Sequence, residues 1–159
     1  MQKQIPVAFI DSSVVGGYYD IEWMKGTREL WRLMELGLVR FVTSSVTFDE
    51  IVLKPKTPAH VVELFNEWFD ANDILPLTNE ARDLADAYIR HGVLTQNSLN
   101  DARQVAICTL ANIDYLVSWN FKHLVGTERK RGFHAINLLQ GRRPVDIVTP
   151  WEIIYDIKQ

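Results

Sequence analysis

The sequence of 159 residues has a single cysteine and no long apolar run. One cysteine excludes a disulfide within the chain, which fits a reducing compartment, and the apolar neighbours of Cys108 predict a buried thiol. The apolar runs are too short to span a bilayer. The first residues pass directly into a strand pattern, without the layout of a signal peptide. We therefore expect a cytoplasmic protein with no membrane association.

Positive charge is not in excess either. Lys and Arg total 17 against 20 Asp and Glu, which gives a formal net charge of −3. This balance argues against a large basic surface that would bind nucleic acid by electrostatics alone. The apolar share of 47% is ordinary for a globular protein, and with this length it predicts a single domain over residues 1–159.

Several motifs that would identify a particular chemistry are also missing. The chain has neither a GxxxxGK[ST] loop nor a GxGxxG turn for nucleotide phosphates. It has no HExxH and no paired cysteines for zinc, and no GxSxG elbow for a serine nucleophile. The carboxylates are therefore the main candidates for chemistry.

Strand-like and helix-like segments alternate along the chain. Apolar segments typical of buried strands lie at 5–10, 39–43, 73–76, 114–119 and 145–149. Between them lie helical patterns, two of which we expect Thr27 and Thr78 to cap. This order predicts an α/β fold, with a mainly parallel sheet of about five strands and helices on both faces.

Four polar residues fall where such a sheet would place a site. Asp11 follows the first strand, and Glu50 lies on a short helix after the second. Asp101 lies in the first turn of the helix before the fourth strand, and Asn120 follows that strand. Because ligands bind beyond the carboxyl ends of parallel strands, we expect the four to meet in one cleft. Taken singly, each also fits a helix cap, a solvated helix position or a turn.

Clustered carboxylates repel one another, and each raises the pKa of the others unless a cation neutralises them. Oxygen ligands suit hard cations, so the pattern favours Mg²⁺ or Mn²⁺. A site of this kind can activate water for attack on a phosphodiester and stabilise the leaving oxygen. The acids therefore predict metal-dependent phosphodiester hydrolysis.

The ordered segments FIDSSVV, SSVTFDEIV, NDARQVAICTLANIDYLVSWNFKHL and IVTPWEI together resemble the PIN-domain nucleases, particularly the toxins of VapBC-type toxin–antitoxin pairs. The resemblance covers nearly the whole chain and implies a three-layer α/β/α sandwich that cleaves RNA with a divalent metal. It places the family's acids on Asp11, Glu50 and Asp101. Family members commonly carry a further acid where this chain has Asn120, whose amide oxygen can ligate a cation but brings no charge. A second metal position is therefore in doubt.

Other residues near these positions admit more than one interpretation. Asp20 and Glu22 either add an acid to the site or belong to a solvated loop. The aromatic residues of the N-terminal quarter either pack in the core, stack on bases or receive a partner helix; they are Tyr18, Tyr19, Trp23 and Trp31.

We therefore expect a metal-dependent endoribonuclease with an RNA substrate and a cognate antitoxin, in a family where homodimers are common. Two alternatives remain open. One is a PIN-like module that binds RNA or protein but cuts poorly because of Asn120. The other is a phosphoacceptor domain of the receiver type, which the chain fits less well because no suitable Lys follows the fifth strand.

Overall fold

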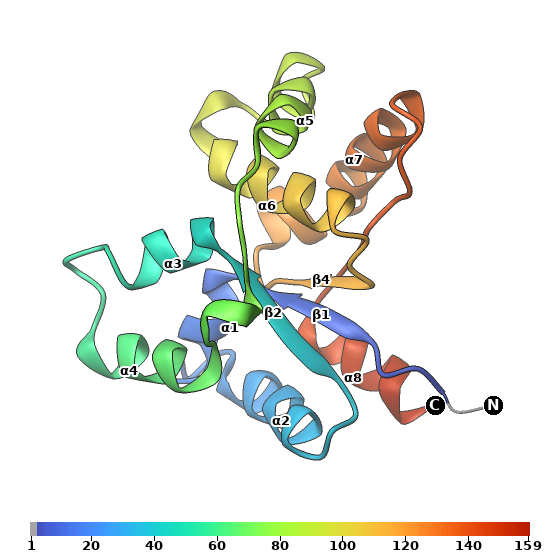
Figure 1. The fold of residues 1–159 in the computed structure, drawn as a ribbon. Helices are drawn as coiled ribbons and strands as arrows, with labels where there is room; N and C mark the ends of the chain where they lie inside the picture. Colours follow the sequence, from blue (N-terminus) through green and yellow to red (C-terminus); the bar gives the residue numbers. More distant parts are fainter. Residues whose placement is uncertain (1–2) are drawn as a thin grey trace.

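The computed structural model describes residues 3–159 and has a parallel sheet at its centre (Figure 1). Five strands lie in the order β3-β2-β1-β4-β5, and every neighbouring pair is parallel. The predicted α/β fold is thus confirmed. The strands are β1 (Val7–Ile10), β2 (Arg40–Ser44), β3 (Ile74–Leu75), β4 (Tyr115–Val117) and β5 (Asp146–Val148).

Helices connect and cover the strands. The α-helices are α1 (Ser12–Gly17), α2 (Met24–Glu35), α3 (Ser45–Ile51), α4 (Ala59–Trp68), α5 (Asn79–Arg90), α6 (Leu99–Leu110), α7 (Thr127–Leu139) and α8 (Pro150–Lys158). Shorter helical turns are η1 (Ala71–Asp73), η2 (Gln96–Ser98) and the π-helical η3 (Phe121–Val125). Within residues 3–159, no helix combines the length and apolarity that a bilayer crossing requires.

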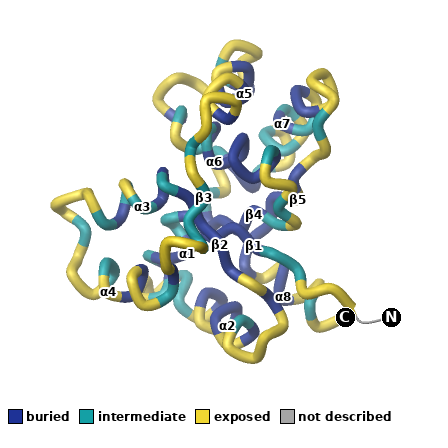
Figure 2. The backbone as a smooth tube through the Cα atoms, in the orientation of Figure 1, coloured by how far each residue is buried: buried dark blue, intermediate teal, exposed yellow. Residues whose placement is uncertain are grey.

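The helices form one layer on each side of the sheet. In Figure 1, α5, α6 and α7 lie above it, and α2, α4 and α8 lie below. Successive residues of β1 point to opposite layers: Phe9 packs with the upper helices, while Ala8 and Ile10 pack with the lower ones. Burial on both faces explains why β1 is wholly apolar and β4 nearly so (Figure 2).

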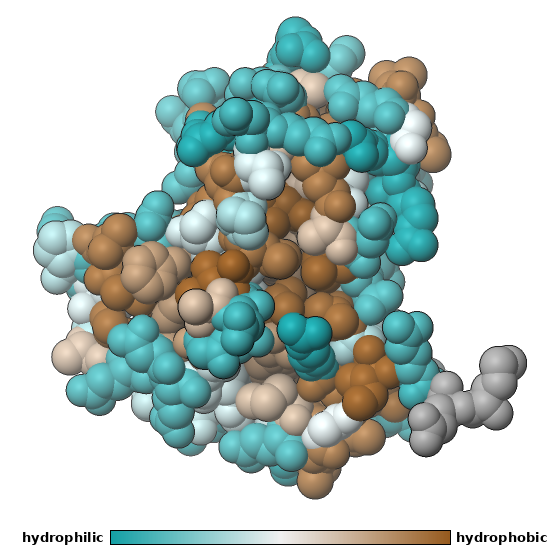
Figure 3. Space-filling model, viewed as in Figure 1, coloured by the Kyte–Doolittle hydropathy of each residue, from teal (hydrophilic) through white to brown (hydrophobic). Residues whose placement is uncertain are grey.

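The outer surfaces of the helices are mostly polar, whereas apolar residues reach the surface between the two layers beside β2 and β3 (Figure 3). The edge strand β3 is only two residues long, which limits the unpaired backbone that this edge presents. Cys108 is fully buried on α6, as predicted.

Side-chain caps fix where several helices begin. The predicted cap at Thr78 is confirmed, because its hydroxyl accepts from the amide of Ala81 at the start of α5. The predicted cap at Thr27 is wrong, since α2 already begins at Met24. Thr27 instead lies fully buried inside α2. It donates to the Trp23 carbonyl at 3.0 Å and accepts from the indole N–H of Trp119 at 3.0 Å.

We predict that replacing Thr27 with Val destabilises the protein. Valine keeps the shape but leaves the buried Trp119 N–H without its acceptor, so the free energy of unfolding should fall by about 1–3 kcal/mol. Urea unfolding followed by tryptophan fluorescence measures this. Thr95→Val is the matched control, because Thr95 is exposed and its side chain makes no cap bond. An equal effect of the two substitutions would contradict the role given to Thr27.

Candidate active site

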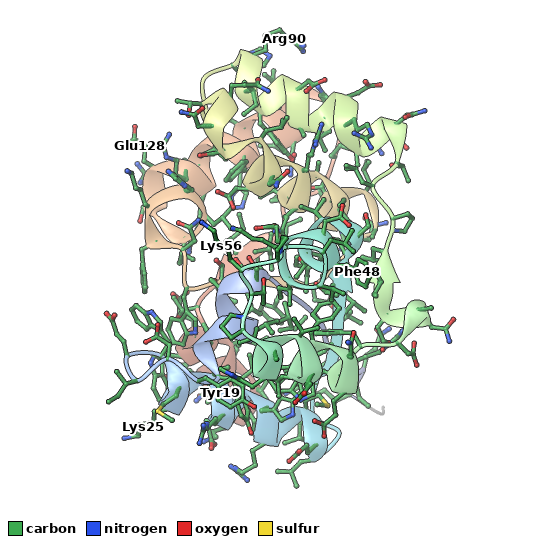
Figure 4. All side chains as sticks on the ribbon, turned by 90° about the vertical axis from the view of Figure 1, so that its left-hand side faces the viewer. Tyr19, Lys25, Phe48, Lys56, Arg90 and Glu128 are labelled. Atoms are coloured by element: carbon green, nitrogen blue, oxygen red, sulfur yellow. The ribbon has the colours of Figure 1, made fainter. Side chains whose placement is uncertain are left out.

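The candidate site lies at the carboxyl edge of the sheet, where β1 and β4 end side by side. The chain leaves β1 toward β2 and β3, and it leaves β4 toward β5 on the other side. Parallel sheets bind ligands in the crevice at such a switch of direction. Figure 4 looks onto this edge, with Phe48 marking α3 and Tyr19 marking the segment after α1.

Asp11 is the most buried acid of the site, with only 3% of its surface exposed. It directly follows β1 and caps α1, because Oδ1 accepts from the amide of Val14 at 3.1 Å. The Ser13 hydroxyl donates to the same oxygen at 2.6 Å, and the Ser118 hydroxyl donates to Oδ2 at 2.5 Å. Both oxygens of the carboxylate are thus held by neighbours on α1 and after β4.

Glu50 approaches the site from α3. Its Oε2 accepts from the Ser12 hydroxyl at 3.3 Å, and its Oε1 accepts from the amide of Gln104 at 3.1 Å. Gln104 is almost fully buried on α6, and its own oxygen accepts from the hydroxyl of Thr47 on α3 at 3.2 Å. A buried chain of hydrogen bonds therefore connects α3 and α6 and orients the Glu50 carboxylate.

Asp101, in the first turn of α6, meets Asn120, which follows β4. The amide nitrogen of Asn120 lies 3.5 Å from Oδ2 of Asp101, and Nδ1 of His123 lies 3.4 Å from the same oxygen. The side-chain oxygen of Asn120 accepts from the backbone N–H of His123 at 3.0 Å and caps η3. Asn120 therefore presents a hydrogen-bond donor to Asp101.

The three carboxylates influence one another electrostatically. Burial raises the pKa of Asp11 to about 6, against the lowering effect of its serine and backbone donors, and the charge of Asp101 raises it further. Burial, then the charges of Asp101 and Asp11, raise the pKa of Glu50 to about 7. Burial also raises the pKa of Asp101, although His123 opposes the shift. The structure thus brings all four predicted residues to one edge.

The donor chemistry of this edge fits a hard divalent cation. Asp11, Glu50 and Asp101 offer carboxylate oxygens, and a cation would relieve the repulsion that raises their pKa values. Across residues 3–159, no three His, Cys, Asp or Glu side chains are grouped closely enough to enclose an ion together. Mg²⁺ commonly takes one or two protein carboxylates and completes its shell with water and phosphate, so a loose set of acids fits it.

Sequence reasoning missed the residues that hold these acids. Ser12 and Ser13 stand next to Asp11 in the sequence, so their proximity was a usable signal. Ser118 and Gln104 reach the site only through the fold, because the Ser118–Asp11 contact joins residues 107 positions apart. Of the N-terminal aromatics, Trp31 is buried and Tyr18 half-buried against it, while Tyr19 is 43% exposed.

Comparison with solved structures identifies the fold. The chain is similar to a chain of VapBC2 from Rickettsia felis, solved bound to a DNA fragment from its promoter, with a TM-score of 0.57 and 12% identity over 90% of this chain and 98% of that one. It is also similar to a chain of a toxin–antitoxin complex from Klebsiella pneumoniae, with a TM-score of 0.52 and 20% identity over 77% of this chain and 93% of that one. No protein-family model and no curated protein sequence matches. The chain thus shares its fold with chains of toxin–antitoxin complexes, as expected from the resemblance noted in the sequence.

We predict that the chelator-treated protein becomes less stable as the pH rises from about 4 to 7. The pKa of Asp11 is raised from 3.8 to about 6 and that of Glu50 from 4.5 to about 7, so the folded state binds more protons than the unfolded state in this range. Asp11→Asn should remove on the order of 2 kcal/mol of this dependence. Urea unfolding in EDTA at pH 5 and pH 7.5 measures it.

The control for this prediction is Asp49→Asn, which alters an exposed aspartate on the same α3 that carries Glu50. It should leave the difference in stability between pH 5 and pH 7.5 unchanged. Stability that rises with pH in the parent protein, or an unchanged difference in Asp11→Asn, would contradict the raised pKa of Asp11.

Proposed function

We propose that this protein is a divalent-metal-dependent endoribonuclease of PIN type and the toxin of a type II toxin–antitoxin pair. The observation that carries the proposal is the meeting of Asp11, Glu50 and Asp101 at the switch point of the sheet. The likeness in fold to proteins of toxin–antitoxin complexes supports it.

In this proposal Asp11, Glu50 and Asp101 would hold Mg²⁺ or Mn²⁺ at the carboxyl edge, one or two of them as direct ligands and the rest through bound water. A bound cation of this kind supplies a water of lowered pKa and stabilises negative charge on a phosphate. The chain's own contribution is orientation: Ser13 and Ser118 fix both oxygens of Asp11, and Gln104 fixes Glu50. Carboxylates held in this way need little rearrangement when the phosphate arrives.

The partners in the proposal are an RNA substrate and a cognate antitoxin protein. The support for an antitoxin is that both similar structures are of toxin–antitoxin proteins. A homodimer is the assembly expected from the sequence resemblance. For RNA near the site, Lys54 is a candidate phosphate contact, because its positive charge acts on Glu50 and partly opposes the rise in the pKa of that carboxyl.

We predict that the purified protein cleaves RNA only with Mg²⁺ or Mn²⁺ present, and that Asp11→Asn loses at least about 100-fold in rate. Mutating a residue that only hydrogen-bonds to a metal ligand typically costs roughly 10–100-fold in activity. Asp11→Asn removes a proposed ligand itself, so its loss should reach or exceed the upper end of that range. A labelled mixed-sequence RNA with added EDTA or MnCl₂ provides the assay. Asp49→Asn serves as the control and should cut normally. Full cleavage in EDTA, or by Asp11→Asn, would refute the proposed site.

A second candidate function is a PIN-like module that binds RNA or protein and cuts poorly. The observation that favours it is the geometry of Asn120, whose oxygen caps η3 while its nitrogen faces Asp101. The amide of Asn120 carries no charge, and in this orientation its oxygen is already used by the cap of η3. A second cation, if the reaction needs one, would then be held weakly.

We predict that Asn120→Asp separates the two candidates. Aspartate keeps the cap acceptor but replaces the donor facing Asp101 with a like charge, so the metal-free melting temperature should fall. Mn²⁺ should restore it, since binding to the folded state stabilises that state. Thermal melts across a Mn²⁺ titration and the RNA cleavage assay are the measurements.

Tighter Mn²⁺ binding with faster cleavage by Asn120→Asp would support an enzyme whose second cation position is weakened by Asn120. Restored melting without any cleavage would favour the binding module. Unchanged melting and rate would place Asn120 outside the metal site, as a turn residue only.

A further inference from the structure

A hollow of about 480 Å³ adjoins the carboxylate edge, between α1, the start of α2 and the end of β4. Two of its lining residues also belong to the acid site: Ser13 bonds to Asp11, and Asn120 lies beside Asp101. A group placed in this hollow would therefore sit next to a phosphate held by the acids. The remaining lining residues are Gly16, Gly17, Asp20, Trp23 and Trp119.

Aromatic rings form one wall of the hollow. Trp23 and Trp119 are stacked, with ring centroids 4.7 Å apart and an interplanar angle of 22°. The ring of Phe121 lies 5.9 Å from that of Trp23. Phe121 directly follows Asn120, and it is 51% exposed although it is a large apolar residue. Phe121 does not itself line the hollow, but its exposed ring lies beside the acid site, tilted by 36° against the ring of Trp23.

A hydrogen bond and close packing fix the position of the Trp119 ring in this wall. The indole N–H of Trp119 is held by Thr27, whose hydroxyl in turn bonds to the carbonyl of Trp23. A side chain on Gly17 would place its Cβ 2.9 Å from Nε1 of Trp119, and one on Gly26 would lie 2.9 Å from Cη2. Both glycines are therefore required for the indole to sit where it does.

The other sides of the hollow are open and carry one carboxylate, that of Asp20. A Cβ on Gly16 would meet nothing within 4 Å, so the α1 side has free space. Asp20 is exposed, and its Oδ1 accepts from the amide of Glu22 at 2.9 Å. An ionised carboxylate only accepts hydrogen bonds, so Asp20 selects a ligand that donates them.

We propose that this hollow binds one base of the RNA substrate beside the cleaved phosphate, with guanine preferred. The inference rests on the proposed function. A base can stack on Phe121 and the Trp23 ring, as bases do on aromatic platforms of other RNA-binding proteins. Guanine offers two donors on its pairing edge, N1–H and the 2-amino group, which match one carboxylate such as that of Asp20. The other bases offer a single donor group there.

The test reads base preference from the cuts themselves. Random-sequence RNA is digested with Mn²⁺, and the ends of the products are sequenced to give base frequencies on both sides of the cut. We expect the parent protein to favour guanine at one position next to the cut. Asp20→Asn and Phe121→Ala should each lower that preference roughly tenfold. Phe121→Trp should keep the guanine preference, because tryptophan also presents an aromatic face at this position.

The control is Tyr155→Ala, which removes an aromatic residue that is 66% exposed on α8, outside the hollow. It should keep the guanine preference. A thermal melt of each variant with and without Mn²⁺ checks folding and metal binding separately from cleavage.

Three results would overturn the inference. If the parent cuts but Asp20→Asn and Phe121→Ala keep its base preference, the hollow does not read the base, whereas the proposed nuclease function stands. If Asp20→Asn weakens Mn²⁺ binding without changing the preference, Asp20 is an acid of the metal site. If the parent cuts no RNA with Mn²⁺, the proposed function fails together with the inference.

Discussion

The rest of the candidate site depends on the hydrogen bonds that hold the buried carboxylate of Asp11. It ends β1, caps α1 and accepts from Ser118 after β4, so it joins three elements at the centre of the sheet. Burying a carboxylate is unfavourable unless hydrogen bonds or a cation compensate. Here three donors hold the group and yet its pKa remains raised to about 6. A buried carboxylate whose pKa stays raised in spite of three donors is suited to binding a cation, because a positive charge stabilises its ionised form.

Ser13 connects this acid to the aromatic wall. Its hydroxyl donates to Asp11 and also accepts from the backbone N–H of Trp119 at 2.9 Å. Trp119 in turn is fixed by Thr27 and stacked on Trp23. The proposed metal position and the proposed base position therefore share one rigid framework. A substitution at the proposed metal position should therefore also affect the proposed base position, and the reverse, through Ser13.

The sequence predicted the fold well because the signals were local. Alternating apolar strands and capped helices indicated the parallel sheet, and the strand ends indicated where acids would gather. The errors arose where tertiary contacts decide. Thr27 is a residue type that often caps helices, but here it lies inside α2, where its hydroxyl accepts from the indole N–H of Trp119. Likewise Ser118 and Gln104 reach Asp11 and Glu50 only after distant segments pack together. The metal-binding role of the acids remains a prediction.

Direct measurement of Mn²⁺ binding tests the central claim, that the acids at this edge form a metal site. Isothermal titration calorimetry of the chelator-stripped protein should show binding at neutral pH. Asp11→Asn and Asp101→Asn should each weaken that binding by roughly tenfold or more, because each removes a charged ligand, while Asp49→Asn should leave it unchanged. No binding by the parent protein, or equal affinity in all four proteins, would contradict the account.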